Sequence, residues 1–175
     1  SVVAAEASGR EIRAREAGFG GQFFAESFVD GREFNLSLLE TASGLRVLPP
    51  AEIEFTAFPA GRPRIVDYEA KWDEGSFAYE NTPRRFDFPP ADAPLLARLA
   101  ELARQAWRLF GLAGYARVDF RVDAEARPWI LEVNLNPCLT PDAGFVAAAD
   151  RAGLDFQALV GAIATTAIRA QRKAG

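Results

Sequence analysis

The sequence predicts an α+β fold, in which antiparallel or mixed sheets built from hairpin-forming strands pack against helices. Apolar residues recur at helical spacing from Leu95 to Leu109, and Gly111 follows them, which predicts an amphipathic helix. Apolar and polar residues alternate over 117–122 and 129–135, on either side of a polar turn. This alternation predicts a pair of neighbouring antiparallel strands.

Several shorter elements are also expected. They are a helix over 8–16, a hairpin of strands 23–29 and 32–39, strands over 53–58 and 64–68, a helix over 145–152 and a last helix from Asp155 onward. Asp30 and Gly31, between the two hairpin strands, form a dipeptide that favours a type I′ turn. Ser8 and Glu11 have the spacing of a helix capping box. The stretch 71–90 has no clear periodicity, which is typical of a lid or a binding loop.

The composition excludes several kinds of chemistry. The chain has 175 residues, of which 49% are hydrophobic, and its net charge of -4 disfavours nucleic acid as a partner. It has no histidine and one cysteine, Cys138, which excludes imidazole bases, disulfides and thiolate zinc sites within the chain. A metal would need oxygen ligands, which favours Mg²⁺. No stretch resembles a signal peptide or a membrane span, so we expect a cytoplasmic protein with no membrane partner.

The predicted pair of strands near the carboxyl end carries a candidate metal site. With a symmetric turn, Asp119 lies opposite Glu132 and Arg117 opposite Asn134, and alternation puts all four on one face. Two carboxylates directly opposite one another repel by about 0.2–1 kcal/mol on a surface. A divalent cation between them would turn this repulsion into attraction, and Asn134 would add a third oxygen ligand. A solvent-facing sheet surface with ordinary charges is the alternative interpretation.

The predicted first hairpin carries a second candidate site. It would place Glu26 opposite Asn35 and Phe28 opposite Glu33, so that carboxylates lie beside an aromatic ring. Such a face suits a sugar hydroxyl and a base, although a simple wet surface is the alternative. Lys71 is by itself typical of a surface charge, and it would matter only beside a phosphate.

Three segments of the chain, in this order, resemble the ATP-grasp ligases of the D-alanine–D-alanine ligase type. Residues 26–34 resemble the adenine and ribose segment of that family, and residues 67–72 resemble the segment with its phosphate-binding lysine. Residues 117–120, followed by 131–137, resemble its arginine and metal-ligand signature. The resemblance implies a partial ATP-grasp fold that extends over most of the chain.

The resemblance also implies a role for each matched residue. It assigns contacts with adenine to Glu26, Ser27, Phe28, Val29 and Leu131, contacts with the ribose hydroxyls to Glu33 and contacts with the phosphates to Lys71. Arg117 and Lys71 would be the catalytic residues, with Arg117 stabilising charge on the transferred phosphoryl group. Asp119, Glu132 and Asn134 would hold two Mg²⁺ ions, for which Mn²⁺ is an alternative.

The implied activity is the ATP-dependent joining of a carboxylate and an amine through an acyl phosphate. The substrates would be small molecules, either amino acids or peptides, and a homodimer is one candidate assembly. We expect residues 1–33 to be the rear part of the small ATP-grasp subdomain. Residues 34–175 would be the large subdomain, with a lid at about 72–89. The alternatives are a nucleotide-binding module without ligase activity and a two-metal phosphoester hydrolase.

The chain departs from the family pattern in two places. The family's glycine-rich phosphate loop and its N-terminal domain would precede Ser1, so we expect the chain alone to lack full activity. After Pro137 the family commonly continues with Gly-Met-Thr, whereas residues 138–143 here read CLTPDA, which does not favour a D-alanine carboxylate. Within that stretch we expect Asp142 to cap the next helix and Cys138 to be a small packing residue.

Overall fold

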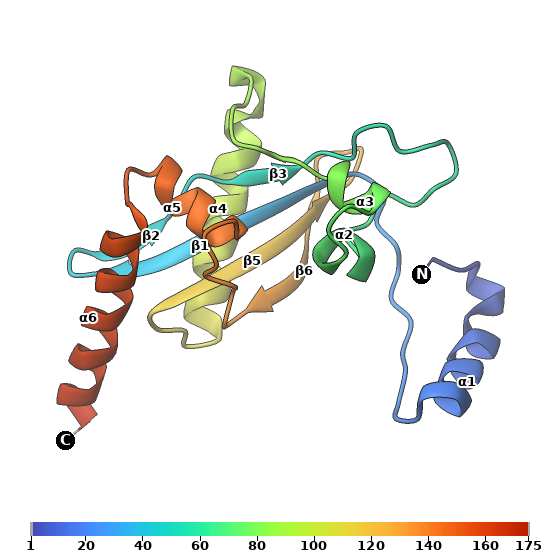
Figure 1. The fold of residues 1–175 in the computed structure, drawn as a ribbon, viewed down its shortest axis with the longest axis horizontal. Helices are drawn as coiled ribbons and strands as arrows, with labels where there is room; N and C mark the ends of the chain where they lie inside the picture. Colours follow the sequence, from blue (N-terminus) through green and yellow to red (C-terminus); the bar gives the residue numbers. More distant parts are fainter. Residues whose placement is uncertain (1, 175) are drawn as a thin grey trace.

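The computed structural model describes residues 2–174, apart from the side chains of Trp72 and 169–174 (Figure 1). The helices are α1 (Ser8–Phe19), α2 (Tyr68–Trp72), α3 (Phe77–Glu80), α4 (Ala93–Leu109), α5 (Gly144–Arg151) and α6 (Phe156–Ala174), with short 3₁₀ helices η1 (Ala5–Ala7) and η2 (Pro90–Asp92). The strands are β1 (Arg32–Thr41), β2 (Gly44–Val47), β3 (Ala51–Ile53), β4 (Arg84–Arg85), β5 (Tyr115–Val122) and β6 (Pro128–Asn134). The predicted α+β class is confirmed.

All the strands join one antiparallel sheet with the order β4-β3-β1-β5-β6. The long central strand β1 pairs with β5 from Arg32 opposite Val122 to Leu39 opposite Tyr115. Its other edge pairs with β3 and then with β2. Strand β6 lies at the edge of the sheet beside β5.

Helices cover the two faces of the sheet differently. On one face, Phe34 and Phe120 pack with Leu99 and Trp107 of α4 in a continuous apolar core. On the other face, a smaller core around Phe145 joins one end of the sheet to α5 and α6. Figure 1 shows α4 behind the sheet, α5 and α6 near β2, and the short helices α2 and α3 at the opposite end. The rest of this second face, between these two groups of helices, is polar.

The amphipathic helix and the carboxyl-terminal strand pair are confirmed, with one change of register. Asp119 lies opposite Glu132 and Arg117 opposite Asn134, as the alternation predicts. Beyond Asp119 the register shifts, so that Phe120 faces Ile130 and not Leu131. This β-bulge adds one residue to β6. The site-bearing end of the hairpin therefore keeps the predicted pairing, and the turn end does not.

The predicted hairpin around Asp30-Gly31 is wrong. Residues 22–30 form no strand, and β1 pairs with β5, β3 and β2 instead. A type I′ turn needs positive φ at both central residues, and among this pair only Gly31 has it, at 148°. Gly31 is needed for a different reason: a Cβ there would lie 2.0 Å from the carbonyl oxygen of Val122. The chain enters β1 by passing directly over the end of β5.

The structure also differs from the sequence predictions at one helix start and in two short strands. Ser8 donates to the carbonyl oxygen of Ala5 at 2.6 Å and does not cap α1, so the predicted capping box is wrong. Of the strand expected over 53–58 only Ile53 is in β3, and the strand expected over 64–68 is absent. The last helix starts where expected, and Asp155 precedes it and accepts from the backbone N–H of Ala158 at 2.7 Å.

The amino-terminal segment lies apart from the sheet. Helix α1 is joined to β1 by an extended segment, and the two chain ends lie at opposite sides of the molecule (Figure 1). The division into residues 1–33 and 34–175 stays a prediction. Among the described residues, no helix combines the length and the apolar character that crossing a membrane requires.

A cluster of ion pairs ties the start of β1 to its neighbours. Arg32 donates to both carboxylate oxygens of Glu52 at 2.8 and 2.7 Å, and to both of Asp92 at 2.8 Å. Arg85 of β4 also binds Glu52. Burial alone would raise the pKa of the Glu52 carboxyl, but the bonds from Arg32 and Arg85 outweigh burial and lower it. The ionised carboxylate of Glu52 therefore stabilises the folded state.

We expect Glu52→Gln to lower the free energy of unfolding at pH 7 by about 1–3 kcal/mol, because charge-assisted hydrogen bonds are lost. Since the folded-state pKa of Glu52 is below its ordinary value of 4.5, this stabilisation is complete above pH 4.5. It is lost as the pH falls through the folded-state pKa. Denaturant unfolding from pH 7 to pH 3 should therefore show the two proteins converging in acid.

Glu54→Gln is the matched control for Glu52→Gln. Glu54 also binds Arg85, at 3.1 Å, but its side chain is 39% exposed against 8% for Glu52. Its loss should change the free energy of unfolding by about 0.5 kcal/mol or less. Equal effects of the two substitutions at pH 7 would contradict the assignment.

We expect Gly31→Ala to lower the free energy of unfolding by about 2 kcal/mol or more, since the added Cβ overlaps backbone that cannot move aside. Gly44→Ala is the control, because Gly44 has a positive φ of 112° but open space around its Cβ position. That change should cost only the strain of a left-handed alanine, about 1 kcal/mol. Denaturant unfolding of both variants tests the difference, and equal losses would argue against the close approach.

Candidate active site

The polar part of the second sheet face forms the floor of a cavity of about 570 Å³. Strand β1 contributes Glu33 and Asn35 to it, and β5 contributes Arg117 and Asp119. The side and the mouth come from α2, α3, β4 and the loop after β6. The charged residues that line this cavity are Lys71, Arg84, Arg117, Glu33, Asp119 and Asp142. Three cations and three anions thus share one concave surface, a setting suited to a charged ligand.

Strand register brings the predicted metal ligands to one place. Asp119 lies between Asn35 on β1 and Glu132 on β6, and Arg117 lies opposite Asn134. Antiparallel residues that face each other directly project from the same side of the sheet. Glu132 is exposed and forms no hydrogen bond or ion pair with any described residue. Its carboxylate is therefore available to a ligand.

Arg117 and Asp119 form a bidentate ion pair at 2.7 and 2.8 Å. Burial by itself lowers the pKa of the Arg117 guanidinium, but the bond to Asp119 and the charges of Asp119, Glu132 and Glu33 raise it above its ordinary value. Arg117 is therefore a permanent cation beside the two opposed carboxylates. It balances part of their charge.

The donor set fits a hard divalent cation that also binds a ligand. The described residues contain no group of three or more Asp, Glu, Cys or His side chains that could hold a metal. Two carboxylates and the amide of Asn134 leave coordination positions for water and phosphate oxygens, which is how Mg²⁺ is usually bound. The Asn134 oxygen already accepts from the backbone N–H of Asn136 at 3.0 Å, which fixes its orientation.

Lys71 reaches the same cavity from α2. Asp67 caps this short helix by accepting from the backbone N–H of Ala70 at 3.1 Å, which sets the place of Lys71 in the chain. The predicted irregular stretch 72–89 contains α3 and β4, and Tyr79, Thr82, Pro83 and Arg84 from it line the cavity. Its location over the site suits a lid, and that role stays a prediction.

Glu33 is buried at the end of the cavity and paired with a residue that the sequence analysis did not single out. Its carboxylate lies 3.2 Å from the guanidinium of Arg121, and the two residues are 7% and 3% exposed. Burial raises the pKa of the Glu33 carboxyl, against the attraction of Arg121. Burial likewise lowers the pKa of the Arg121 guanidinium. The alternation that placed Arg117 and Asp119 on one face would also have placed Arg121 there.

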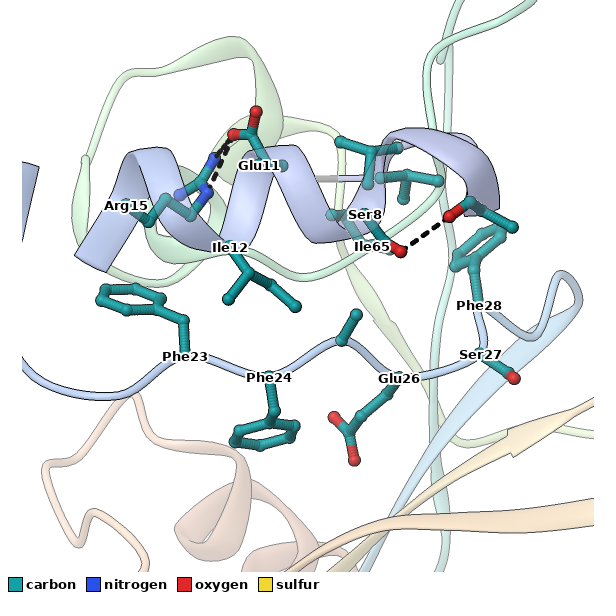
Figure 2. A pocket seen from close by; sticks show the side chains of 14 residues that line it. Ser8, Glu11, Ile12, Arg15, Phe23, Phe24, Glu26, Ser27, Phe28 and Ile65 are labelled. Atoms are coloured by element: carbon teal, nitrogen blue, oxygen red, sulfur yellow. Dashed lines mark hydrogen bonds and ion pairs between the residues drawn. The ribbon is translucent and has the colours of Figure 1, made fainter. Parts of the chain in front are cut away.

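The predicted adenine residues lie elsewhere. Glu26, Ser27 and Phe28 line a second cavity, of about 590 Å³, between the 22–28 segment and α1 (Figure 2). Leu131, on the exposed bulge of β6, lines neither of these two cavities, and nor does Val29. Of the residues predicted to bind phosphate and metal, Lys71, Arg117, Asp119 and Asn134 line one cavity, and Glu132 faces Asp119 without lining it. Leu131 is not joined to the Glu26–Phe28 segment.

Two expectations for the loop after β6 are wrong. Cys138 is exposed at the cavity rather than packed, and its Sγ lies 3.2 Å from the hydroxyl of Thr140, a contact that lowers its pKa. Asp142 does not cap α5, because it precedes the N-cap residue, Ala143, by one position. Its backbone carbonyl instead accepts from Arg84 at 2.9 Å.

The family model and the curated relatives that match this chain all belong to one family. The family model for the D-ala D-ala ligase C-terminus matches residues 3–165. The D-alanine–D-alanine ligase of Bordetella petrii is 35% identical over 167 residues, which cover 94% of this chain and 47% of that relative. The ligase of Gloeobacter violaceus is 38% identical over 139 residues, covering 79% and 41%. The chain therefore spans about half the length of the curated relatives that it matches.

Solved structures show the same likeness in the fold. The D-alanine–D-alanine ligase from Coxiella burnetii matches 99% of the chain and 42% of its own, with a TM-score of 0.72 at 16% identity. The ligase from Bacillus anthracis complexed with ATP matches 86% of the chain and 42% of its own, with a TM-score of 0.64 at 23% identity. The ATP-grasp fold predicted from the sequence is confirmed.

Proposed function

We propose that this chain, which belongs to the family of the D-ala D-ala ligase C-terminus, carries the phosphoryl-transfer site of an ATP-dependent carboxylate–amine ligase. One observation supports the proposal above the others. Asp119, Glu132 and Asn134 share one sheet face with Arg117, and all of these except Glu132 line the cavity that Lys71 also lines. Phosphoryl transfer requires mainly positioning and charge neutralisation, which these five side chains provide without a histidine.

The proposed reaction has two steps. A carboxylate oxygen of the first substrate forms a bond to the γ-phosphorus of ATP as the bond to the β-phosphate oxygen breaks, which gives an acyl phosphate and ADP. The amine of the second substrate then attacks the acyl carbon, inorganic phosphate leaves, and the nitrogen loses a proton. Arg117 and Lys71 would neutralise the negative charge on the transferred group. A lid formed by residues 72–89 would keep water from the acyl phosphate.

Asp119, Glu132 and Asn134 are proposed to hold Mg²⁺, one or two ions, with Mn²⁺ as an alternative. The bound cation would supply charge neutralisation and orientation for the phosphates. Glu33 is proposed to accept from the ribose hydroxyls, and residues 26–29 with Leu131 to contact adenine. Leu131 and the 26–29 segment are not in one cavity here, so this part of the proposal requires them to approach when the nucleotide binds.

The proposed substrates are small amino-acid or peptide carboxylates and amines. The loop over 138–142, with its acidic residue at the cavity, does not favour a D-alanine carboxylate, so the acid and the amine need not be D-alanine. Cytoplasmic location, a homodimeric assembly, the absence of nucleic-acid and membrane partners and the division into two subdomains stay predictions.

We expect Glu132→Gln in the full-length protein to reduce substrate-dependent ADP release by about a hundredfold or more, because a charged metal ligand is lost. The Mg²⁺ concentration needed for half-maximal rate should rise as well. The measurement is ADP release at several Mg²⁺ concentrations with amino-acid donors and amine acceptors. Glu125→Gln is the control, since Glu125 lies in the turn of the same hairpin and is paired with Arg127, whereas Glu132 faces Asp119.

The outcomes separate the proposal from its alternatives. Unchanged ADP release and Mg²⁺ dependence in Glu132→Gln would overturn the metal assignment. Nucleotide binding without substrate-dependent ADP release would indicate a binding module without ligase activity. Release of an alcohol or nucleoside from a phosphoester, with no amine present, would indicate a hydrolase.

A further inference from the structure

Arg121 makes contacts that its place in a strand does not require. Its Nη1 donates to the carbonyl oxygen of Gly31 at 2.9 Å, and its Nη2 donates to the carbonyl oxygen of Arg64. The same Nη2 lies 3.2 Å from Oε2 of Glu33. One guanidinium therefore joins β5 to the start of β1 and to the loop after β3.

Two aromatic rings flank the same group. The guanidinium carbon lies 5.8 Å from the ring centre of Phe28 and 5.4 Å from that of Phe55. These distances are within the range of cation–π attraction. Phe28 belongs to the extended segment that also carries Glu26 (Figure 2), and Phe55 belongs to the loop that leads toward α2 and Lys71. Arg121 thus contacts the chain on both sides of the proposed nucleotide site.

Burying a guanidinium this completely is costly unless its donors are satisfied. A sheet interior at this position is more simply filled by an apolar residue, as Phe120 and Val122 do on the opposite face. Arg121 donates hydrogen bonds to backbone carbonyls of two segments and forms an ion pair with one carboxylate. This pattern fixes the relative positions of those three groups, which an apolar side chain could not do.

The Glu33 carboxylate keeps unused acceptor capacity. Its Oε2 lies 3.2 Å from Arg121, and the carboxylate accepts no hydrogen bond from any described residue. Glu33 lines the cavity that also contains Lys71 and Asp119, and Arg121 does not line it. A carboxylate that is paired with a buried guanidinium and accepts no hydrogen bond can still accept one from a hydroxyl group of a ligand.

We propose that Arg121 is the positioning residue of the nucleoside site: it fixes the carboxylate of Glu33 and the two segments on either side, so that Glu33 accepts hydrogen bonds from the ribose hydroxyls. This inference rests on the proposed ATP-dependent function. It adds that a residue which does not touch the nucleotide determines how strongly its sugar is recognised.

The test compares ATP with 2′,3′-dideoxy-ATP, which lacks both ribose hydroxyls, in the full-length protein. The readouts are KM and kcat for each nucleotide in substrate-dependent ADP release, with the melting temperature of each variant. Arg121→Met removes the guanidinium and keeps a side chain of similar length. Arg121→Lys keeps the charge but cannot bind the carboxylate and both carbonyls at once. Arg127→Met is the control, because Arg127 is an exposed arginine of the same hairpin with its own ion pairs.

The wild-type protein should have a KM for dideoxy-ATP about tenfold or more above that for ATP, since charge-assisted hydrogen bonds to the sugar are lost. In Arg121→Met the KM for ATP should rise to near the dideoxy-ATP value, so that the ratio of the two falls toward one, with kcat changed less than KM. Arg121→Lys should give an intermediate ratio, and Arg127→Met the wild-type ratio.

A purely structural role for Arg121 would give a different result. It would lower the melting temperature of Arg121→Met and leave the ratio of the two KM values unchanged, which would overturn the inference. If Arg121→Met does not fold, Arg121→Lys decides, and an undiminished ratio there would also overturn it. A wild-type ratio near one would refute the sugar contact itself. A different outcome would refute the proposed function itself: no release of ADP from ATP by the wild-type protein with any donor and acceptor.

Discussion

The antiparallel pairing of β1 with β5 is the constraint on which the rest of the molecule depends. Over eight residue pairs it sends Phe34, Leu36 and Phe120 toward α4, and Glu33, Asn35 and Asp119 toward the cavity. Because side chains alternate across a strand, a slip of one residue would exchange the two sets. Packing of the core on one face sets the strand register, and this register in turn sets the positions of the charged side chains on the other face.

Charge in the cavity is arranged for a ligand that is itself highly charged. Glu132, which does not line the cavity, faces Asp119 and forms no ion pair with any described residue, while Asp119 is bound by Arg117. On the far side Lys71 and Arg84 add positive charge. A divalent cation would be attracted by the two opposed carboxylates, and a polyphosphate by the lysine and arginines. The same reasoning explains why the proposed phosphoryl transfer would not require a histidine.

The parts that the sequence predicted correctly depend on short-range patterns. The β5–β6 register follows from alternation within one hairpin, and α4 follows from its apolar spacing. The expected Asp30-Gly31 turn failed because pairing with β5, some ninety residues along the chain, outweighed a local turn preference. The same limit concealed Arg121, whose partners Gly31 and Arg64 are 90 and 57 residues away in sequence. Relations over such separations leave no local pattern in a single sequence.

The bulge in β6 also bears on whether the exposed edge of the sheet can pair with other protein chains. Strand β6 is an outer strand, and Trp129, Ile130 and Leu131 on it are about half exposed. A flat outer strand with such side chains is a template for pairing with other chains, and so for aggregation. The extra residue interrupts the regular row of backbone donors and acceptors and increases the local twist. The irregularity that sets Leu131 apart from its neighbours thus also helps to keep the protein from associating edge to edge.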